Sequence, residues 1–142
     1  MIRIAVLLLA LTAFTSCTRD GVTESAAQNA YELWRSKNIH DYSIDQMRSC
    51  FCPDAGQLVR ITVRSDTIYS VIRISDNTVL SNPFFFTVDS LFGIINNSKT
   101  DSLVIRYNKD YGFPEFLDIN PQQHPYDGGV LYETSNLKIK RE

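Results

Sequence analysis

Two amphipathic helical patterns, each followed by three strand-like runs, place the strongest constraint on the fold of this chain. Both patterns carry apolar residues at positions i, i+3, i+4 and i+7, which is the period of a helix with one buried face. These residues are Ala27, Ala30, Tyr31 and Trp34 in the first pattern, and Val88, Leu91, Phe92 and Ile95 in the second. The order predicts an α+β fold, in which two helices pack on one face of an antiparallel sheet of about six strands, in the order α-β-β-β-α-β-β-β.

Capping residues predict where the two helices begin and end. Ser25 begins a capping box and Asn38 suits a C-terminal cap, so the first helix is expected over residues 25–37. Thr87 is expected to be the N-cap of the second helix. Trp34, the only tryptophan, is expected in the core.

The clearest strand pair lies between the helices. Residues 57–64 predict a strand in which Val59, Ile61 and Val63 point inward and alternate with Arg60, Thr62 and Arg64, which point outward. β-branched residues are frequent over residues 67–74. Ser65 and Asp66 separate the two runs, which predicts a hairpin with a tight turn.

Four further runs complete the expected sheet. They cover residues 41–52, 103–107, 113–120 and 130–139. Pro114 is tolerated most easily on an edge strand, because proline donates no backbone hydrogen bond. The repeated order of elements also suggests a duplicated α-β-β-β unit.

The N-terminus predicts export and lipidation. Residues 1–16 have a positive Arg3 followed by an apolar stretch that is too short to span a bilayer, as in a signal peptide. The next residues, Phe14-Thr15-Ser16-Cys17, resemble a bacterial lipobox, in which the cysteine becomes the lipidated first residue of the mature chain. We therefore expect a membrane anchor at Cys17.

The remaining chain is expected to form one domain. Residues 17–23 read as the lipidated cysteine and a short tether, and residues 24–142 as a single α+β domain. By similarity to lipoproteins of bacteria with two membranes, Thr18 in place of Asp favours the outer membrane, with the domain facing the periplasm. The chain has 16 acidic and 14 basic residues without a basic patch, which argues against a nucleic-acid partner.

The sharpest chemical feature is the pair Cys50 and Cys52 in the sequence Arg48-Ser49-Cys50-Phe51-Cys52-Pro53. In a regular strand the two Cα atoms would lie roughly 6.5–7 Å apart, at the upper limit for a disulfide. A bridge would therefore need the chain to curl before Pro53. The pair is a candidate for a structural or labile disulfide, for thiol exchange, or for a copper or zinc site completed by His40 or His124.

Other catalytic patterns are absent from the sequence. There is no Cys-x-x-Cys motif, no Gly-x-Ser-x-Gly elbow and no glycine-rich phosphate loop. We therefore expect a protein that is not an enzyme and needs no cofactor. Three adjacent aromatic residues, Phe84, Phe85 and Phe86, are a further candidate for a surface that faces a ligand or partner.

Several short motifs together resemble the bacterial lipoprotein family called domain of unknown function 6174. They are Trp34, Asp41-Tyr42-Ser43, Arg48-Ser49-Cys50-Phe51-Cys52-Pro53, Val88-Asp89-Ser90-Leu91-Phe92, Tyr107, Tyr111-Gly112-Phe113-Pro114, Asp118, Asn120, Asp127-Gly128-Gly129 and Tyr132. The resemblance covers about residues 30 to 137. It implies a cell-envelope lipoprotein with an α+β sheet, and it supplies no catalytic residues.

Two functional hypotheses follow. The first is a non-enzymatic envelope module that binds a protein, a glycan or a small ligand through a face or edge of the sheet. The alternative is a thiol-disulfide or soft-metal protein centred on Cys50 and Cys52.

Overall fold

The structure is a computed structural model that describes residues 20–53, 55–81, 84–99, 101–126 and 128–140. The helices are α1 (Asp20–Ser36), α2 (Val88–Asn97) and the short 3-10 helix η1 (Pro121–Tyr126). The strands are β1 (Tyr42–Ser49), β2 (Leu58–Arg64), β3 (Thr67–Arg73), β4 (Leu103–Tyr107), β5 (Pro114–Ile119) and β6 (Val130–Ile139). The predicted order α-β-β-β-α-β-β-β is confirmed, with η1 inserted before the last strand.

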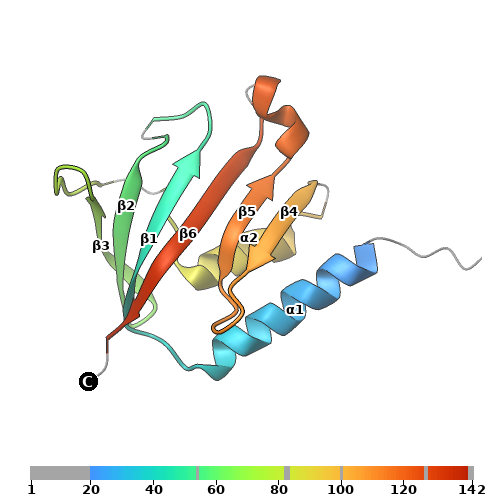
Figure 1. Cartoon of the computed structure of the whole chain (residues 1–142), viewed down its shortest axis with the longest axis horizontal. Coiled ribbons are helices and arrows are strands. Elements are labelled where there is room, and N and C mark those ends of the chain that lie inside the picture. Colours follow the sequence, from blue (N-terminus) through green and yellow to red (C-terminus); the bar gives the residue numbers. More distant parts are fainter. Residues whose placement is uncertain (1–19, 54, 82–83, 100, 127, 141–142) are drawn as a thin grey trace, which may run out of the picture.

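The strands form one antiparallel sheet in the order β3-β2-β1-β6-β5-β4. β1 and β6 are the two central strands, so the two halves of the chain meet along them (Figure 1). In the first half the strand after the helix is central, whereas in the second half it is at the edge. In each half, however, the three strands are neighbours in chain order, and the first strand lies on the same side of the three, so the duplicated α-β-β-β unit stays a prediction.

Both helices pack on the same face of the sheet (Figure 1). Tyr42 of β1 shows this directly. Its ring meets Trp34 of α1 edge-on at 5.5 Å between centroids, and its hydroxyl accepts a hydrogen bond of 3.0 Å from the backbone N–H of Val88 at the start of α2. The other face of the sheet, which we call the helix-free face, is covered by no helix of the described chain.

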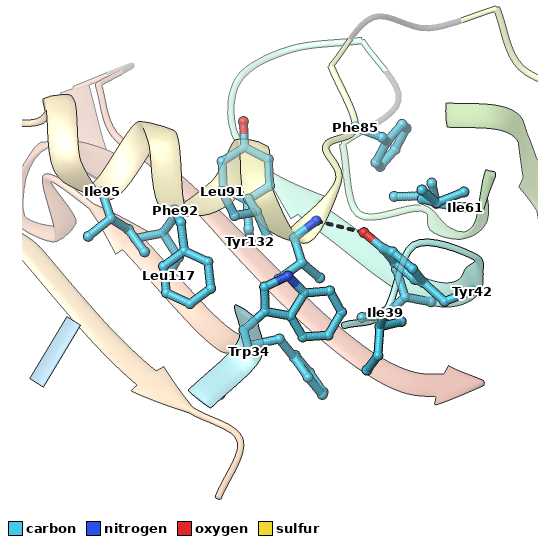
Figure 2. Close-up of a cluster of buried hydrophobic side chains, with 14 of the residues drawn as sticks. Trp34, Ile39, Tyr42, Ile61, Phe85, Leu91, Phe92, Ile95, Leu117 and Tyr132 are labelled. Carbon is cyan, nitrogen blue, oxygen red and sulfur yellow. Dashed lines mark hydrogen bonds between the residues drawn. The ribbon is translucent and has the colours of Figure 1, made fainter. Parts of the chain in front are cut away.

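Side chains from the helices and the inner face of the sheet form a single core (Figure 2). The apolar stripes of both helices point into it, and Trp34 is buried as expected. The three alternating residues of β2, which are Val59, Ile61 and Val63, are fully buried. Each of these residues belongs to one side of a regular pattern, so this part of the core followed from periodicity.

The helix starts were predicted with unequal success. Thr87 is the N-cap of α2, and its side-chain oxygen accepts a hydrogen bond from the backbone N–H of Ser90. In contrast, α1 begins at Asp20, and Ser25 lies inside the helix instead of capping it. The apolar stripe marks only the part of a helix that is buried, so it cannot locate an end that extends past the core.

The hairpin and the proline were also tested. Ser65 and Asp66 both have positive φ, at 46° and 62°. Positive φ at both central residues is typical of the two-residue type I′ turn, whose twist matches that of the strands it joins. Pro114 is not on an edge strand, since β5 lies between β6 and β4. It is instead the first residue of β5, at a register shift between Arg106 and Tyr107, where a missing donor is tolerated.

Gly112 sets how closely α1 approaches the sheet. Its φ is +83°, and a Cβ atom at this position would lie 2.2 Å from the carbonyl oxygen of Ala30 and 3.0 Å from the backbone nitrogen of Trp34. The β4–β5 turn therefore touches the backbone of α1 without an intervening side chain. This contact brings Trp34 down onto β1.

Candidate functional site

The helix-free face carries a band of apolar side chains that crosses the whole sheet. Residues paired across neighbouring strands point to the same face, so the register identifies the members of this band. They are Ile72, Leu58, Met47, Leu131, Phe116 and Val104, one from each strand in the order in which the strands lie in the sheet. Leu58 and Val104 are exposed and the others are half-buried. We call this set the apolar band.

A buried ion pair lies beside the apolar band. The carboxylate of Asp45 in β1 accepts hydrogen bonds from Nε and Nη2 of Arg60 in β2, at 2.7 and 2.9 Å, and from Nδ2 of Asn136 in β6, at 3.0 Å. Asp45 is 1% exposed although it is on the helix-free face. Burial alone would raise the pKa of Asp45, but the hydrogen bonds from Arg60 and Asn136 outweigh burial and hold this pKa below its ordinary value.

His124 and Asp118 form a second polar pair, between η1 and β5. Nε2 of His124, on η1, lies 2.7 Å from Oδ1 of Asp118 on β5. Both side chains are partly buried. Within the described residues the imidazole makes no hydrogen bond to a hydroxyl or thiol. The pair orients η1 against the sheet.

The aromatic member of the band is covered on one side. The guanidinium carbon of Arg106 in β4 lies 4.2 Å from the centroid of the Phe116 ring in β5. This cation–π contact occupies a face of the ring that would otherwise be free to stack on a sugar or a base.

Cys50 and Cys52 lie in a turn and not in a strand. β1 ends at Ser49, so the expected strand over residues 41–52 is too long at its C-terminal end. The turn closes with a hydrogen bond of 2.7 Å from the backbone N–H of Gly56 to the carbonyl of Arg48. Because the chain curls, the two cysteine Cα atoms are only 5.3 Å apart and the sulfur atoms lie within bonding distance. This separation of the Cα atoms suits a disulfide.

A buried arginine supports this turn from the core side. Arg48 is 4% exposed, and its Nη2 donates a hydrogen bond of 2.8 Å to the carbonyl of Pro53. The guanidinium carbon also lies 4.5 Å from the centroid of the Phe84 ring. Arg48 therefore joins the cysteine turn to the segment before α2. We did not identify this role from the sequence, although Arg48 shares the inward-facing parity of Tyr42 and Ile44.

The three adjacent phenylalanines do not form one surface. Phe85 is 2% exposed and belongs to the core. Phe86 is half-buried, with its ring 5.6 Å from Tyr132, and its backbone is paired with the side chain of Gln46 at 3.0 and 3.3 Å. Phe84 alone is exposed. The expected patch is therefore reduced to one residue, because alternate side chains of an extended segment point in opposite directions.

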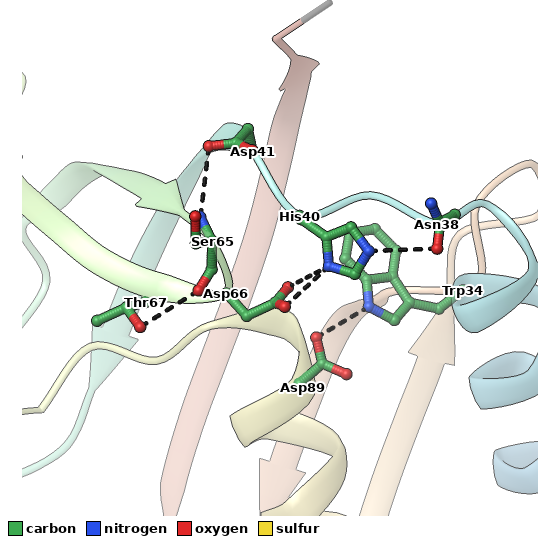
Figure 3. A network of polar contacts seen from close by, with 8 residues as sticks. All are labelled: Trp34, Asn38, His40, Asp41, Ser65, Asp66, Thr67 and Asp89. Carbon is green, nitrogen blue, oxygen red and sulfur yellow. Dashed lines mark hydrogen bonds and ion pairs between the residues drawn. The ribbon is translucent and has the colours of Figure 1, made fainter.

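The two histidines do not join the cysteines. His40 precedes β1, at the end opposite to Cys50, and its Nδ1 lies 2.8 Å from Asp66 while its Nε2 lies 3.2 Å from Asn38 (Figure 3). His124 is bound to Asp118. In the part of the chain that the structure describes, no group of three His, Cys, Asp or Glu side chains is arranged to hold a metal ion.

Figure 3 shows what His40 does instead. The His40–Asp66 pair and a backbone hydrogen bond of 3.1 Å from Asp66 to the His40 carbonyl join the β2–β3 turn to the segment after α1. Nearby, Nε1 of Trp34 donates a hydrogen bond of 3.2 Å to Asp89 in the first turn of α2. These contacts tie both helices to one end of the sheet.

A hollow of about 550 Å³ lies at the β4–β5 turn. Its walls are formed by Arg106, Tyr107, Asn108, Lys109, Asp110 and Glu115. Charges of both signs line it, and it is open to solvent. Such a surface lacks the apolar enclosure of a small-molecule site.

Cys17 and the segment before Asp20 lie outside the described residues. No helix among those residues is long and apolar enough to cross a membrane.

No curated protein and no solved structure matches the chain. A family model described as "Family of unknown function (DUF6174)" matches residues 26–139, which include every strand and most of α1. The chain therefore belongs to the DUF6174 family.

Proposed function

We propose that this protein is a lipid-anchored, non-enzymatic binding module of the cell envelope, and that its helix-free face binds a protein partner. The apolar band is the observation that carries the proposal. A solvated face of an antiparallel sheet usually carries polar side chains, because water covers it. Here each of the six strands contributes an apolar residue to this face. Leu58 and Met47 are direct partners across β1 and β2, and the other members lie at diagonal positions between neighbouring strands. Exposed apolar surface of this kind typically marks an interaction site.

The charges around the apolar band favour a particular kind of partner. Arg60 is neutralised by Asp45, and Arg106 is stacked on Phe116. Glu133 of β6 lies between Met47 and Phe116 in the register, and within the described chain it has no cationic partner. A partner segment with apolar side chains and a lysine or arginine opposite Glu133 would complement this face.

A protein fits this surface better than a glycan. Sugar recognition commonly uses an open aromatic ring face, and the Phe116 ring is covered by Arg106. The remaining members of the band are aliphatic or methionine side chains, which pack well against other side chains.

Site-specific cross-linking in intact envelopes tests the proposal. A photoreactive benzoylphenylalanine at Val104 or Leu58, both exposed on the helix-free face, should give the same protein adduct. The same group at Asn29, on the exposed side of α1, is the control and should not give it. Glu133→Lys should abolish the adduct, whereas Asp110→Lys, an equal charge change in the β4–β5 turn, should leave it. Equal adducts from all positions, or none, would refute the proposed face.

The anchor has a separate test. The full-length chain should be recovered with membranes and should carry acyl chains on Cys17, as seen by intact-mass measurement. Cys17→Ser should release the protein from the membrane fraction. A full-length protein without acyl chains would refute the lipid anchor and leave the apolar band untouched.

The alternative function is thiol-disulfide exchange at Cys50 and Cys52. It is favoured by the adjacent sulfur atoms and by the partial exposure of both side chains. If the pair acts in exchange, replacing both cysteines with serine should abolish an activity while the free energy of unfolding changes by only about 1–2 kcal/mol, since the closed ring is very short. Alkylation with and without reductant and chelator distinguishes a disulfide from a bound metal. Cysteines that react freely in every condition would rule out both.

A further inference from the structure

Exposed aromatic side chains from three separate segments gather at one end of the sheet. Phe51 lies in the turn after β1, Tyr126 is the last residue of η1 before β6, and Phe84 stacks on Arg48 near the end of β1. The register pairs Ser49 with Leu131, so the end of β1 and the start of β6 are side by side. The three aromatic residues therefore surround a single end of the molecule, which we call the aromatic end.

These aromatic side chains are exposed to solvent, and hydrogen bonds hold the segments that carry them. Phe51 is 75% exposed and Tyr126 is 85% exposed. The turn that carries Phe51 is closed by the Gly56–Arg48 hydrogen bond and by the bond from Arg48 to Pro53. Tyr126 follows His124, which is bound to Asp118. Transfer of these rings from water to an apolar or interfacial environment would be favourable.

The start of α1 lies at the same end. In Figure 1, α1 and β6 both run toward the end of the sheet where the C-terminus lies, so the start of α1 lies toward the opposite end, outside β4. Thr18 and Arg19 alone separate Cys17 from Asp20, the first residue of α1. The proposed tether is therefore short, because a chain segment spans at most about 3.6 Å per residue.

We infer that the aromatic end is a membrane-contact surface, which lies in the headgroup region of the bilayer that holds the Cys17 acyl chains. This inference rests on the proposed lipid anchor. The short tether brings the start of α1 to the bilayer, and the direction of α1 brings Phe51 and Tyr126 with it. Aromatic residues are enriched at the membrane–water interface, where the ring is desolvated while a polar atom stays wet.

This orientation also serves the proposed binding function. With the aromatic end in the headgroups, the strands run away from the membrane and the helix-free face stands roughly perpendicular to it. The apolar band then faces sideways into the periplasm and is not hidden against lipid. The contact restricts rotation of the domain about its tether, which reduces the entropy lost when a partner binds.

Quenching by brominated lipid tests the inference on the full-length acylated protein. The vesicles contain phosphatidylethanolamine and phosphatidylcholine, with or without bromine on the phosphatidylcholine acyl chains. Phe51→Trp places a reporter at the aromatic end, and Tyr126→Trp is a second reporter in case the cysteine turn does not tolerate tryptophan. Tyr69→Trp is the matched control, because Tyr69 is an exposed aromatic near the β2–β3 turn at the opposite end of the sheet. Trp34 is buried and identical in all variants.

The expected result is a loss of fluorescence in brominated vesicles for Phe51→Trp and Tyr126→Trp, with no loss for Tyr69→Trp beyond that of the unsubstituted protein. Equal quenching at both ends, or no quenching at either reporter of the aromatic end in acylated protein, would overturn the inference. A chain that carries no acyl group by intact mass overturns the anchor itself and the inference with it, so the two failures are distinguishable.

Discussion

Asp45 and Arg60 form a two-bond ion pair across β1 and β2, and the carboxylate is 1% exposed on a sheet face that no helix of the described chain covers. Asn136, 91 residues further along the chain, donates the third hydrogen bond from β6. These hydrogen bonds from the Asp45 carboxylate thus link the three neighbouring strands β2, β1 and β6. The ion pair buries the Asp45 carboxylate and neutralises the partly exposed Arg60, so the surface beside the apolar band carries less net charge than its sequence indicates.

The Asp45–Arg60 ion pair is expected to stabilise the folded protein. We expect Asp45→Asn to lower the free energy of unfolding at neutral pH by about 2 kcal/mol, because Arg60 and Asn136 lose a charged acceptor while Arg60 stays partly solvated. Urea unfolding followed by circular dichroism measures this. Asp76→Asn, which alters an exposed pair with Arg73, is the control and should leave the free energy of unfolding nearly unchanged.

The pH dependence has a defined sign. The pKa of Asp45 is lower in the folded protein than in the unfolded chain. Its stabilising contribution is therefore fully present above the unfolded pKa of about 3.9 and is lost as pH falls through the folded pKa. Between about pH 5 and about pH 2, Asp45→Asn should show a smaller drop in stability than the unsubstituted protein. Parallel acid curves for the two proteins would contradict this assignment.

Two core tyrosines differ in their hydroxyl groups, which gives a matched pair of variants. The hydroxyl of Tyr42 accepts the backbone N–H of Val88, whereas the buried hydroxyl of Tyr107 has no partner among the described residues. Tyr42→Phe should lower the free energy of unfolding by about 1–3 kcal/mol, since it orphans a buried donor. Tyr107→Phe should be neutral within about 0.5 kcal/mol or stabilising. Equal losses in the free energy of unfolding for the two variants would contradict a specific contribution of the Val88–Tyr42 hydrogen bond.

The same tyrosine predicts an alkaline effect. Burial raises the pKa of Tyr107 to about 12, above its ordinary value. Its contribution to stability is fully present below the unfolded pKa of about 10 and is lost as pH rises through about 12. Tyr107→Phe should therefore lose less stability than the unsubstituted protein over this range in urea titrations. Some alkaline loss should remain, because burial also raises the pKa of Tyr132.

Gly112 should tolerate no side chain. In Gly112→Ala the new Cβ would lie 2.2 Å from the Ala30 carbonyl oxygen at a φ of +83°, so we expect a loss of at least about 3 kcal/mol in the free energy of unfolding. Gly56→Ala is the control, because Gly56 also has a positive φ but no atom lies within 4 Å of its new Cβ. This control should cost about 1 kcal/mol. Similar thermal or urea midpoints for both variants would mean that the α1 contact is not tight.

Capping of α2 can be tested separately. Thr87→Ala removes the side-chain oxygen that accepts the Ser90 N–H, so the free energy of unfolding should fall by about 1 kcal/mol. Thr67→Ala, at an exposed strand start, is the control for loss of a threonine in general. Thr87→Asp should restore most of the lost stability, since aspartate also caps a helix and suits its positive end.

Local patterns in the sequence predicted the elements of this fold well. Both helical stripes, the alternation of β2, the Ser65–Asp66 turn and the Thr87 cap all appear in the structure. Each depends on residues close together in the chain, where side-chain parity and backbone geometry decide the outcome. The register likewise places Met47 on the face opposite Tyr42 and Ile44, as side-chain parity along β1 requires.

The candidate site was predicted less completely. The cysteine pair was singled out, but a strand was expected to continue through it, and Arg48 was not seen as the support of the turn. The aromatic patch at Phe84–Phe86 proved to be split between core and surface. Arg60 was placed correctly on the solvent side of its strand. The pairing of Arg60 with Asp45 could not be predicted in this way, because alternation within one strand does not show which residues of the neighbouring strand lie beside it.

The sequence by itself therefore determined which residues form helices and strands and which side of each is buried. Only the tertiary structure decided that β6 lies between β1 and β5, which brings Asn136 to Asp45 and assembles the apolar band from six strands. The physical reason is that backbone hydrogen bonds are the same for any pair of neighbouring strands. The choice among strand orders depends on how all the buried faces pack together, and that property belongs to the whole core and not to any segment of the chain.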